Sequence, residues 1–234
     1  MVALPLALRY KVYVTDQDYA SRQLRTIRSL MERATIYRSL SAPTALIGGL
    51  LSFGGFATAY YAKHHRHFPL SSGEFLSVWL AILALTAFAN LFFLWRGSVQ
   101  RGEPFFSSGM KCALSSLAPA FLTAGVLSLL IHRPIQLALL WITLYGMALL
   151  ATQHFAPRSL VVLGGSFFLT GCALMVTWKH LFMPPGAGEP SALVVSGLMA
   201  ATFGGFHLVY AAAVWALGED QIEATSTSPV SGHV

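Results

Sequence analysis

Residues 135–153 read IQLALLWITLYGMALLATQ, an apolar run without a charged side chain. A transmembrane helix needs roughly 20 mostly apolar residues to cross about 30 Å of hydrocarbon, and this run is long enough. Residues 131–134 (IHRP) connect it to a second apolar run at about 110–131. Because so short a link brings consecutive helices together in opposite directions, the sequence predicts an antiparallel hairpin of two membrane-spanning helices.

Four more runs of this kind extend the pattern along the chain, and none of the runs contains Asp, Glu or Arg in its body. The composition agrees, since 55% of the 234 residues are hydrophobic and 10% are charged, against roughly 25% charged in an average soluble domain. The sequence therefore predicts an all-α, six-span transmembrane bundle over residues 43–217. Residues 1–42 would be a cytoplasmic segment and residues 218–234 a disordered cytoplasmic tail. The additional runs are at about 43–62, 75–95, 159–178 and 192–217.

The basic residues predict the orientation. If the amino-terminal segment is cytoplasmic, eleven Lys and Arg side chains lie inside and four lie outside, which satisfies the positive-inside rule. Both termini are then cytoplasmic, and we expect a bacterial inner-membrane protein. The net charge of +6 reflects this topology, and we expect no nucleic-acid partner. The four outside residues are Lys63, Arg66, Arg133 and Lys179.

Residues 17–40 are predicted to form an amphipathic helix, because apolar residues recur at steps of three and four along one face. Its basic face could bind lipid headgroups or a partner protein. Alternatively, the helix packs under the bundle and its arginines only enforce topology. The docking candidates are Arg22, Arg25, Arg28 and Arg33.

Local signals predict how helices begin and pack. Ser71 and Glu74 have the spacing of a capping box, and Pro134 suits the first position of a helix. Small residues follow one another at intervals of four in the last span, which predicts close helix packing there. They are Gly197, Ala201 and Gly205.

The last span also contains one ionisable side chain, His207. Depth along the predicted spans places it with Tyr145, Asn90 and Tyr210 in a polar layer, which Ser115, Ser116 and Ser166 approach from neighbouring spans. One interpretation is a ligand or proton-relay contact, since ionisable groups inside membranes are commonly functional. The other is a neutral imidazole that hydrogen-bonds to Tyr145 or Asn90 and holds helices together.

The bodies of the predicted spans contain no carboxylate, since all nine acidic residues lie in tails, loops or span edges. Ion-coupled transport usually needs a buried carboxylate, and no protease, nucleotide-binding or redox motif is present. We expect no catalysis, and the sequence requires no cofactor. The external histidines are weak metal candidates, better explained as solvated residues at span ends, so we expect no metal site. They are His64, His65, His67 and His180.

Three stretches resemble an uncharacterised family of small bacterial membrane proteins with six spans. They are residues 27–49, which include IRSLMERA and two glycines, residues 144–150 (LYGMALL) and residues 203–210 (FGGFHLVY). The resemblance implies a six-span architecture and draws attention to Tyr145 and His207, and it implies no activity.

The leading functional hypothesis is an accessory, scaffold or signal-coupling subunit that docks partners through its basic helix. Its partners would be membrane lipids and either subunits of a complex or further copies of the chain. An alternative is a binding protein for a lipid, quinone, pigment or haem, since the chain has 16 Phe, 8 Tyr and 5 Trp and Tyr145 with His207 could hold a polar group. An uncoupled facilitator of small solutes is the third hypothesis.

Overall fold

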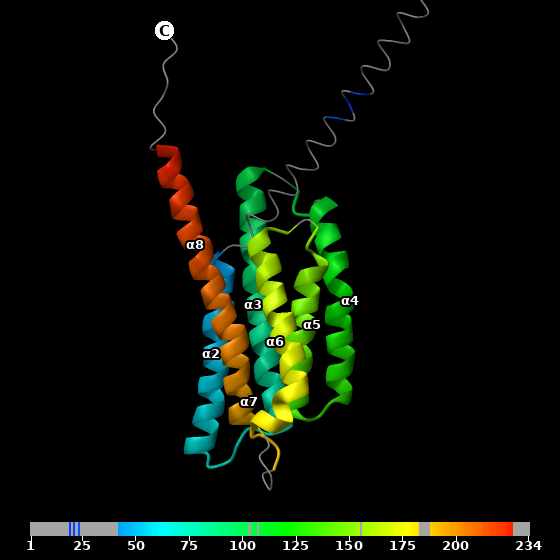
Figure 1. Cartoon of the computed structure of the whole chain (residues 1–234), viewed down its shortest axis with the longest axis vertical. Coiled ribbons are helices and arrows are strands. Elements are labelled where there is room, and N and C mark those ends of the chain that lie inside the picture. The colour runs from blue at the N-terminus through cyan, green and yellow to red at the C-terminus, as the bar shows by residue number, and fades with distance from the viewer. Residues whose placement is uncertain are drawn as a thin grey trace, which may run out of the picture.

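The computed structural model describes residues 19, 21, 23, 42–102, 104–106, 108–154, 156–182 and 188–226. Within these residues the regular structure is entirely helical, and six helical segments are long and apolar enough to span a membrane (Figure 1). The predicted six-span bundle is therefore confirmed. The elements are α2 (Ala42–His65), α3 (Ser72–Arg101), α4 (Ser108–Leu130), α5 (Pro134–Ala151), α6 (Arg158–Phe182), α7 (Ala192–Met199), the π-helix η1 (Ala200–Gly204) and α8 (Gly205–Ser226).

Helix starts follow the predicted local signals. The Ser71 hydroxyl accepts from the Glu74 backbone N–H at 3.2 Å, while the Glu74 carboxylate accepts from the Ser71 N–H at 2.9 Å. This is the reciprocal capping box expected for α3. The other Glu74 oxygen accepts from Arg66 at 2.9 Å, which ties the loop before α3 to the end of α2. Pro134 lies in the first turn of α5 as predicted.

The closest helix pair in the bundle is α5 with α6, and glycines allow the approach. A Cβ added to Gly146 would meet the backbone nitrogen of Phe168 and the carbonyl oxygen of Gly164, the latter at 2.8 Å. A Cβ on Gly164 would lie 2.8 Å from the Cβ of Leu149. These backbones are therefore in direct contact, which is how membrane helices gain packing energy where lipid offers no hydrophobic drive.

The second close pairing joins α2 to η1 and α8. A Cβ on Gly49 would lie 2.9 Å from the Leu208 side chain, and one on Gly204 would lie 2.8 Å from Phe53. The predicted small-residue stripe is wrong at Gly205, where an added Cβ would meet nothing within 4 Å. The reason is the π-helix, in which the Gly205 N–H bonds to the carbonyl of Ala200. This wider turn shifts the register, so that Gly204 faces α2 instead.

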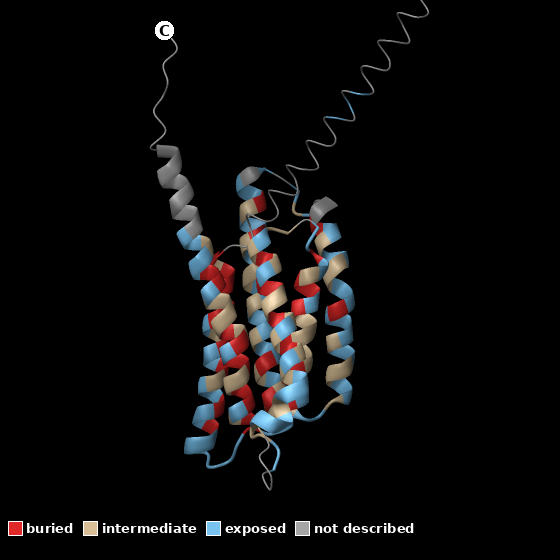
Figure 2. Cartoon of the chain, in the orientation of Figure 1, coloured by how far each residue is buried: buried red, intermediate tan, exposed pale blue. Residues whose placement is uncertain are grey.

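Burial is uneven across the bundle. The buried core joins α2, α5, α6, α7 and α8 with the start of α3, and Figure 2 shows most of α4 exposed. Only 6% of the α4 span and 11% of the α3 span are buried inside the protein, compared with 44% for α2 and α5. In a membrane these exposed apolar faces of α3 and α4 would contact lipid.

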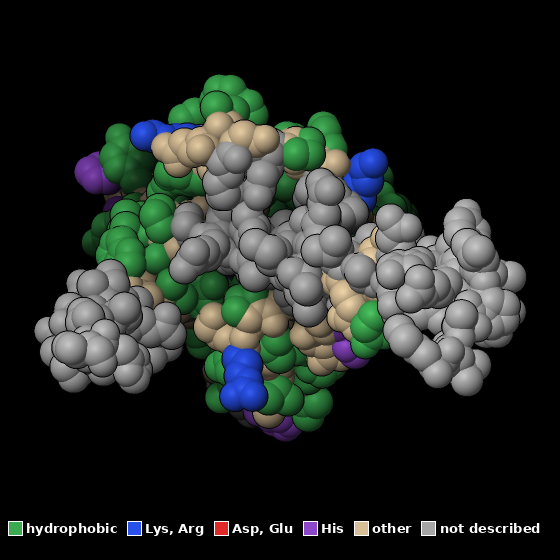
Figure 3. All heavy atoms as spheres, turned by 90° about the horizontal axis from the view of Figure 1, so that it is seen from above, with side chains coloured by type: hydrophobic (Ala, Val, Ile, Leu, Met, Phe, Trp, Pro, Cys, Tyr) green, Lys and Arg blue, Asp and Glu red, His purple; other side chains and the backbone are tan. Residues whose placement is uncertain are grey.

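Basic side chains lie at both ends of the bundle. Figure 3 views the end toward which α8 extends, where Lys and Arg side chains lie at separate places on the rim. At the opposite end two arginines are paired with carboxylates, since Arg66 bonds to Glu74 at 2.9 Å and Arg133 to Glu189 at 2.6 Å. These ion pairs neutralise two of the four Lys and Arg side chains at that end.

The carboxyl-terminal boundary differs from the prediction. The disordered tail was expected from residue 218, but α8 continues as a helix to Ser226. An established helix adds each further residue at little cost, whereas starting a new helix is unfavourable. The polar sequence after the span contains Glu, Gln and Ala, which are good helix formers, and it therefore continues the helix beyond the apolar span.

Candidate functional site

His207 and Tyr145 form a hydrogen-bonded pair inside the bundle. Tyr145 Oη lies 2.9 Å from His207 Nε2, and His207 Nδ1 lies 2.7 Å from the Phe203 carbonyl oxygen. A carbonyl oxygen can only accept, so Nδ1 carries the proton and donates. In the neutral imidazole Nε2 is then the acceptor, and the Tyr145 hydroxyl donates to it. The Tyr145 bond anticipated from the sequence is therefore present, and both ring nitrogens have partners.

Aromatic rings surround this pair. Tyr145 packs edge-on against Phe167 of α6 with centroids 4.9 Å apart, and its ring centroid lies 5.2 Å from that of Phe203. Phe121 of α4 adds a further edge contact with Tyr145 at 6.5 Å. Four helical elements thus meet around one tyrosine. Such aromatic packing fixes the ring's position and so fixes the direction of its hydroxyl.

The other members of the predicted polar layer do not join this pair. The side-chain carbonyl oxygen of Asn90 is buried without a hydrogen-bond partner among the described residues. Tyr210 is buried and forms no hydrogen bond to Tyr145 or His207. The three predicted serines bond to carbonyl groups of their own helices, Ser115 and Ser116 to Cys112 and Ser166 to Val162. The layer is therefore a single bonded pair with separate polar groups nearby.

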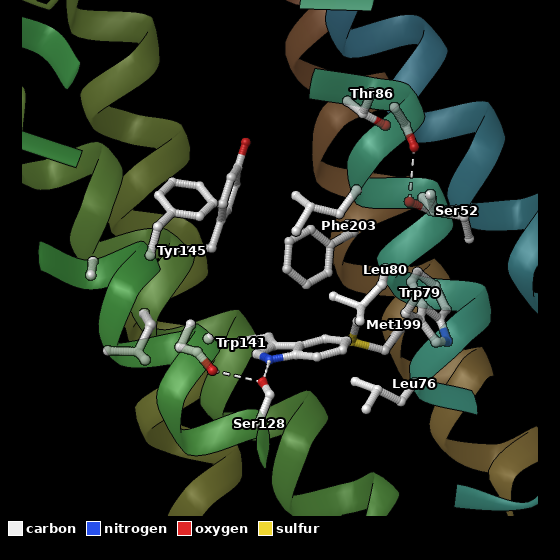
Figure 4. Close-up of a pocket in the computed structure, with 18 of the residues that line it drawn as sticks. Ser52, Leu76, Trp79, Leu80, Thr86, Ser128, Trp141, Tyr145, Met199 and Phe203 are labelled. Carbon is white, nitrogen blue, oxygen red and sulfur yellow. Dashed lines mark hydrogen bonds between the residues drawn. The ribbon is translucent and has the colours of Figure 1, made fainter. Parts of the chain in front are cut away.

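A cavity of about 320 Å³ lies beside the Tyr145–His207 pair (Figure 4). Most of the residues that line it are apolar, and no charged side chain is among them. Its volume is at the lower end of the range for small-molecule pockets, which fits one slender ligand. The lining residues are Gly48 and Ser52 of α2, Leu76, Trp79, Leu80, Ile82, Leu83 and Thr86 of α3, Ala120, Phe121, Ala124, Gly125, Ser128 and Leu129 of α4, Trp141, Leu144 and Tyr145 of α5, Met199 of α7, Phe203 of η1 and His207 of α8.

The cavity opens on the apolar surface between α3 and α4, which would face lipid in a membrane. Its lining residues Leu83 on α3 and Leu129 on α4 are 46% and 76% exposed. Among the described helices α4 packs mainly on α5 and α3 mainly on α2, so α3 and α4 do not close against each other. A molecule dissolved in the bilayer could therefore reach the cavity from the side, without passing through either polar surface.

Small side chains on α4 create part of this space. Ala120, Ala124 and Ser128 recur at intervals of four and all line the cavity. Spacing of this kind usually marks a face on which another helix packs closely. Here α3 does not pack against this face, so the space that larger side chains would fill is empty. This pattern was the available sequence signal for the cavity, and the sequence analysis did not use it.

Most polar groups on the cavity wall are already bonded within the protein. The Trp141 indole N–H donates to Ser128 Oγ at 2.8 Å, and Ser128 in turn donates to the Ala124 carbonyl at 2.6 Å. Ser52 donates to the Gly48 carbonyl at 2.8 Å. Figure 4 shows these groups around the cavity, with Thr86 on the α3 wall opposite Tyr145.

The remaining predicted sites do not come together. His64 and His65 lie against the rings of Tyr60 and Tyr61, with centroids 4.3 and 4.5 Å apart. Within the described part of the chain, no three His, Cys, Asp or Glu side chains are close enough to hold a metal ion. The docking arginines of the amphipathic helix, Arg22, Arg25, Arg28 and Arg33, lie outside the described residues.

Comparison with known proteins finds no matching family model, no matching curated protein and no matching solved structure. The resemblance inferred from the sequence therefore stays a prediction. The cavity and the bonded pair beside it are the observations on which a function can be argued.

Proposed function

We propose that this integral membrane protein is a non-catalytic binding protein that takes one slender apolar molecule from the bilayer into the cavity between α3 and α4. The observation that carries the proposal is the cavity itself, an apolar space of about 320 Å³ that opens toward lipid. A binding site for a molecule dissolved in hydrocarbon needs an opening of this kind and a lining of this polarity.

The wall opposite the opening supports this function because it is fixed. Tyr145 is bonded to His207 and packed against Phe167 and Phe203. A wall with one conformation does not have to be ordered when the ligand binds, and the entropy cost of binding is lower. The Tyr145–His207 bond then shapes the site by holding α5 against α8.

The docking role that the sequence analysis favoured depends on arginines outside the described residues, and it remains a separate prediction. We also infer, from the basic rim seen in Figure 3 and the ion pairs at the opposite end, that the end reached by α8 faces the cytoplasm. The opening between α3 and α4 would then lie in the mid-membrane and outer half of the bilayer.

Tryptophan fluorescence can test the proposed binding, since Trp79 and Trp141 both line the cavity. The variant W95F/W178F/W215F retains only these two tryptophans. A dibrominated fourteen-carbon alkane, added to this variant in detergent, should quench their emission saturably, because bromine quenches only on contact. Quenching that rises linearly with the probe, without saturation, would contradict a defined site.

A matched pair of glycine variants separates the cavity from general partitioning into the detergent. Gly125 lines the cavity and an added Cβ there would meet nothing within 4 Å, so Gly125→Phe can fill space at the wall. Gly54 of α2 is equally open but lies outside the cavity. Gly125→Phe should weaken saturable quenching at least tenfold, while Gly54→Phe should leave it unchanged. Equal effects of the two variants would refute the site.

A further inference from the structure

Hydroxyl side chains within the spans are, as a rule, bonded to their own helix. Ser52, Thr58, Thr123, Thr143 and others donate to the carbonyl four residues earlier, at 2.8 to 2.9 Å. This arrangement is expected in hydrocarbon, where a hydroxyl without a partner costs several kcal/mol.

Several hydroxyls depart from this rule, among them those of Thr44 and Ser196, which are buried without a partner among the described residues, and that of Thr86. Of these, Thr86 lines the cavity. The Thr86 hydroxyl forms no hydrogen bond within the described part of the chain, and its oxygen is not fully buried. The side chain is half-buried and lines the cavity, so the cavity is where a bound molecule could reach this oxygen. Its methyl carbon lies 3.0 Å and its hydroxyl oxygen 3.7 Å from the position that a Cβ on Gly48 would take, so the side chain lies against α2 at the cavity wall.

The position of Thr86 gives the site a direction. It lies 14 residues after Ser72, the first residue of α3, which is about 20 Å along the helix axis at 1.5 Å per residue. The opposite end of the cavity is formed by apolar residues near the helix ends, including Leu76 and Leu129. The cavity therefore has an apolar end near the membrane surface and one unbonded hydroxyl near mid-membrane.

We propose that Thr86 is the polar anchor of the bound molecule, and that the ligand is a long apolar chain with a single uncharged oxygen that accepts a hydrogen bond. This inference rests on the proposed function. The oxygen binds at Thr86 and the chain extends toward Leu76 and Leu129.

The hydroxyl protons of Ser52 and Ser128 and the Trp141 N–H are already donated within the protein. The Trp79 N–H also has no partner among the described residues, but its nitrogen is fully buried. Thr86 is therefore the donor that the cavity offers for recognition.

The lining also excludes charged ligands. No Lys, Arg, Asp or Glu lines the cavity, and a carboxylate or phosphate moved there would lose its hydration without gaining a counter-charge. Long-chain alcohols, ketones and similar neutral molecules fit this chemistry. Fatty-acid anions and phospholipid headgroups do not.

Competition against the brominated alkane tests the assignment. Tetradecane and 1-tetradecanol have the same chain and differ by one oxygen, so their displacement of the probe from the two-tryptophan variant isolates that oxygen. A hydrogen bond is worth about 0.5–1.5 kcal/mol net, and the alcohol should therefore displace the probe at a concentration about three- to tenfold lower than the alkane.

Variants at Thr86 then show which residue causes the preference. Thr86→Val keeps the β-branched shape and removes the hydroxyl, so the alcohol and the alkane should become equal while the alkane keeps its wild-type value. Thr86→Ser should retain the preference. The control Thr58→Val removes a hydroxyl that is bonded to Gly54 outside the cavity and should also retain it.

Two results would overturn this inference while leaving the proposed function intact. One is an undiminished alcohol preference in Thr86→Val, and the other is tighter binding of tetradecanoate than of tetradecanol. Absence of saturable quenching by the brominated alkane would instead remove the proposed function, and the inference with it.

Discussion

Substitution of Gly146 by alanine should destabilise the bundle by forcing α5 and α6 apart. The new Cβ would lie 2.8 Å from both the Gly164 carbonyl oxygen and the Phe168 Cα, where ordinary contact begins at 3.4 Å. The helices must therefore separate by about 0.6 Å or more. The obstructing atoms are backbone, so no side-chain rotation relieves the contact. Overpacking of this kind costs about 1–3 kcal/mol.

Gly165→Ala is the matched control, because a Cβ there would meet nothing within 4 Å. Both substitutions gain the same helix propensity, about 1 kcal/mol, which cancels in the comparison. Gly146→Ala should therefore unfold about 1–3 kcal/mol more easily than Gly165→Ala. Reversible unfolding in mixed mild detergent and SDS, followed by circular dichroism, measures the difference. Equal stability of the two variants would refute the direct backbone contact between α5 and α6.

Three further predictions concern the bonded pair, the helix start and the topology. A double-mutant cycle of Tyr145→Phe with His207→Leu should give a coupling energy of about 0.6 kcal/mol in SDS unfolding; a value of zero would contradict the hydrogen bond. Ser71→Ala should lower the free energy of unfolding by about 1 kcal/mol through loss of the α3 cap, and Ser71→Thr should restore most of it. A membrane-impermeant maleimide applied to intact cells should label Glu189→Cys and spare His154→Cys; the reverse pattern would invert the proposed orientation.

The spans and their starts could be predicted from sequence because the signals are local. Length and apolarity decide each span, and the Ser71–Glu74 box depends on residues three apart. The Tyr145–His207 bond was also within reach, since counting residues along antiparallel spans gives each side chain a depth. Depth alone could not show which groups face each other, and Asn90 and Tyr210 at similar depths have other surroundings.

The cavity and the π-helix could not be predicted in this way. The π-helix at Ala200–Gly204 has a wider turn than an α-helix, and periodicity assumes a regular turn throughout. The cavity depends on the separation of α3 from α4. This separation is set by the packing of α3 on α2 and of α4 on α5. The small residues Ala120, Ala124 and Ser128 predict equally well a closely packed helix or an empty space, and only the position of α3 distinguishes the two.

Photo-crosslinking provides the most direct test of apolar binding between α3 and α4. A long-chain alcohol that carries a diazirine on its chain would be irradiated with the purified protein, and the labelled residues would be mapped by mass spectrometry. Labels concentrated on cavity residues such as Leu83, Ala124 and Gly125, and lost in Gly125→Phe, are the predicted result. Equal labelling of the exposed α6 residues Val162, Leu169 and Val176, which are 67%, 69% and 79% exposed, would contradict it, because labelling would then follow lipid contact alone.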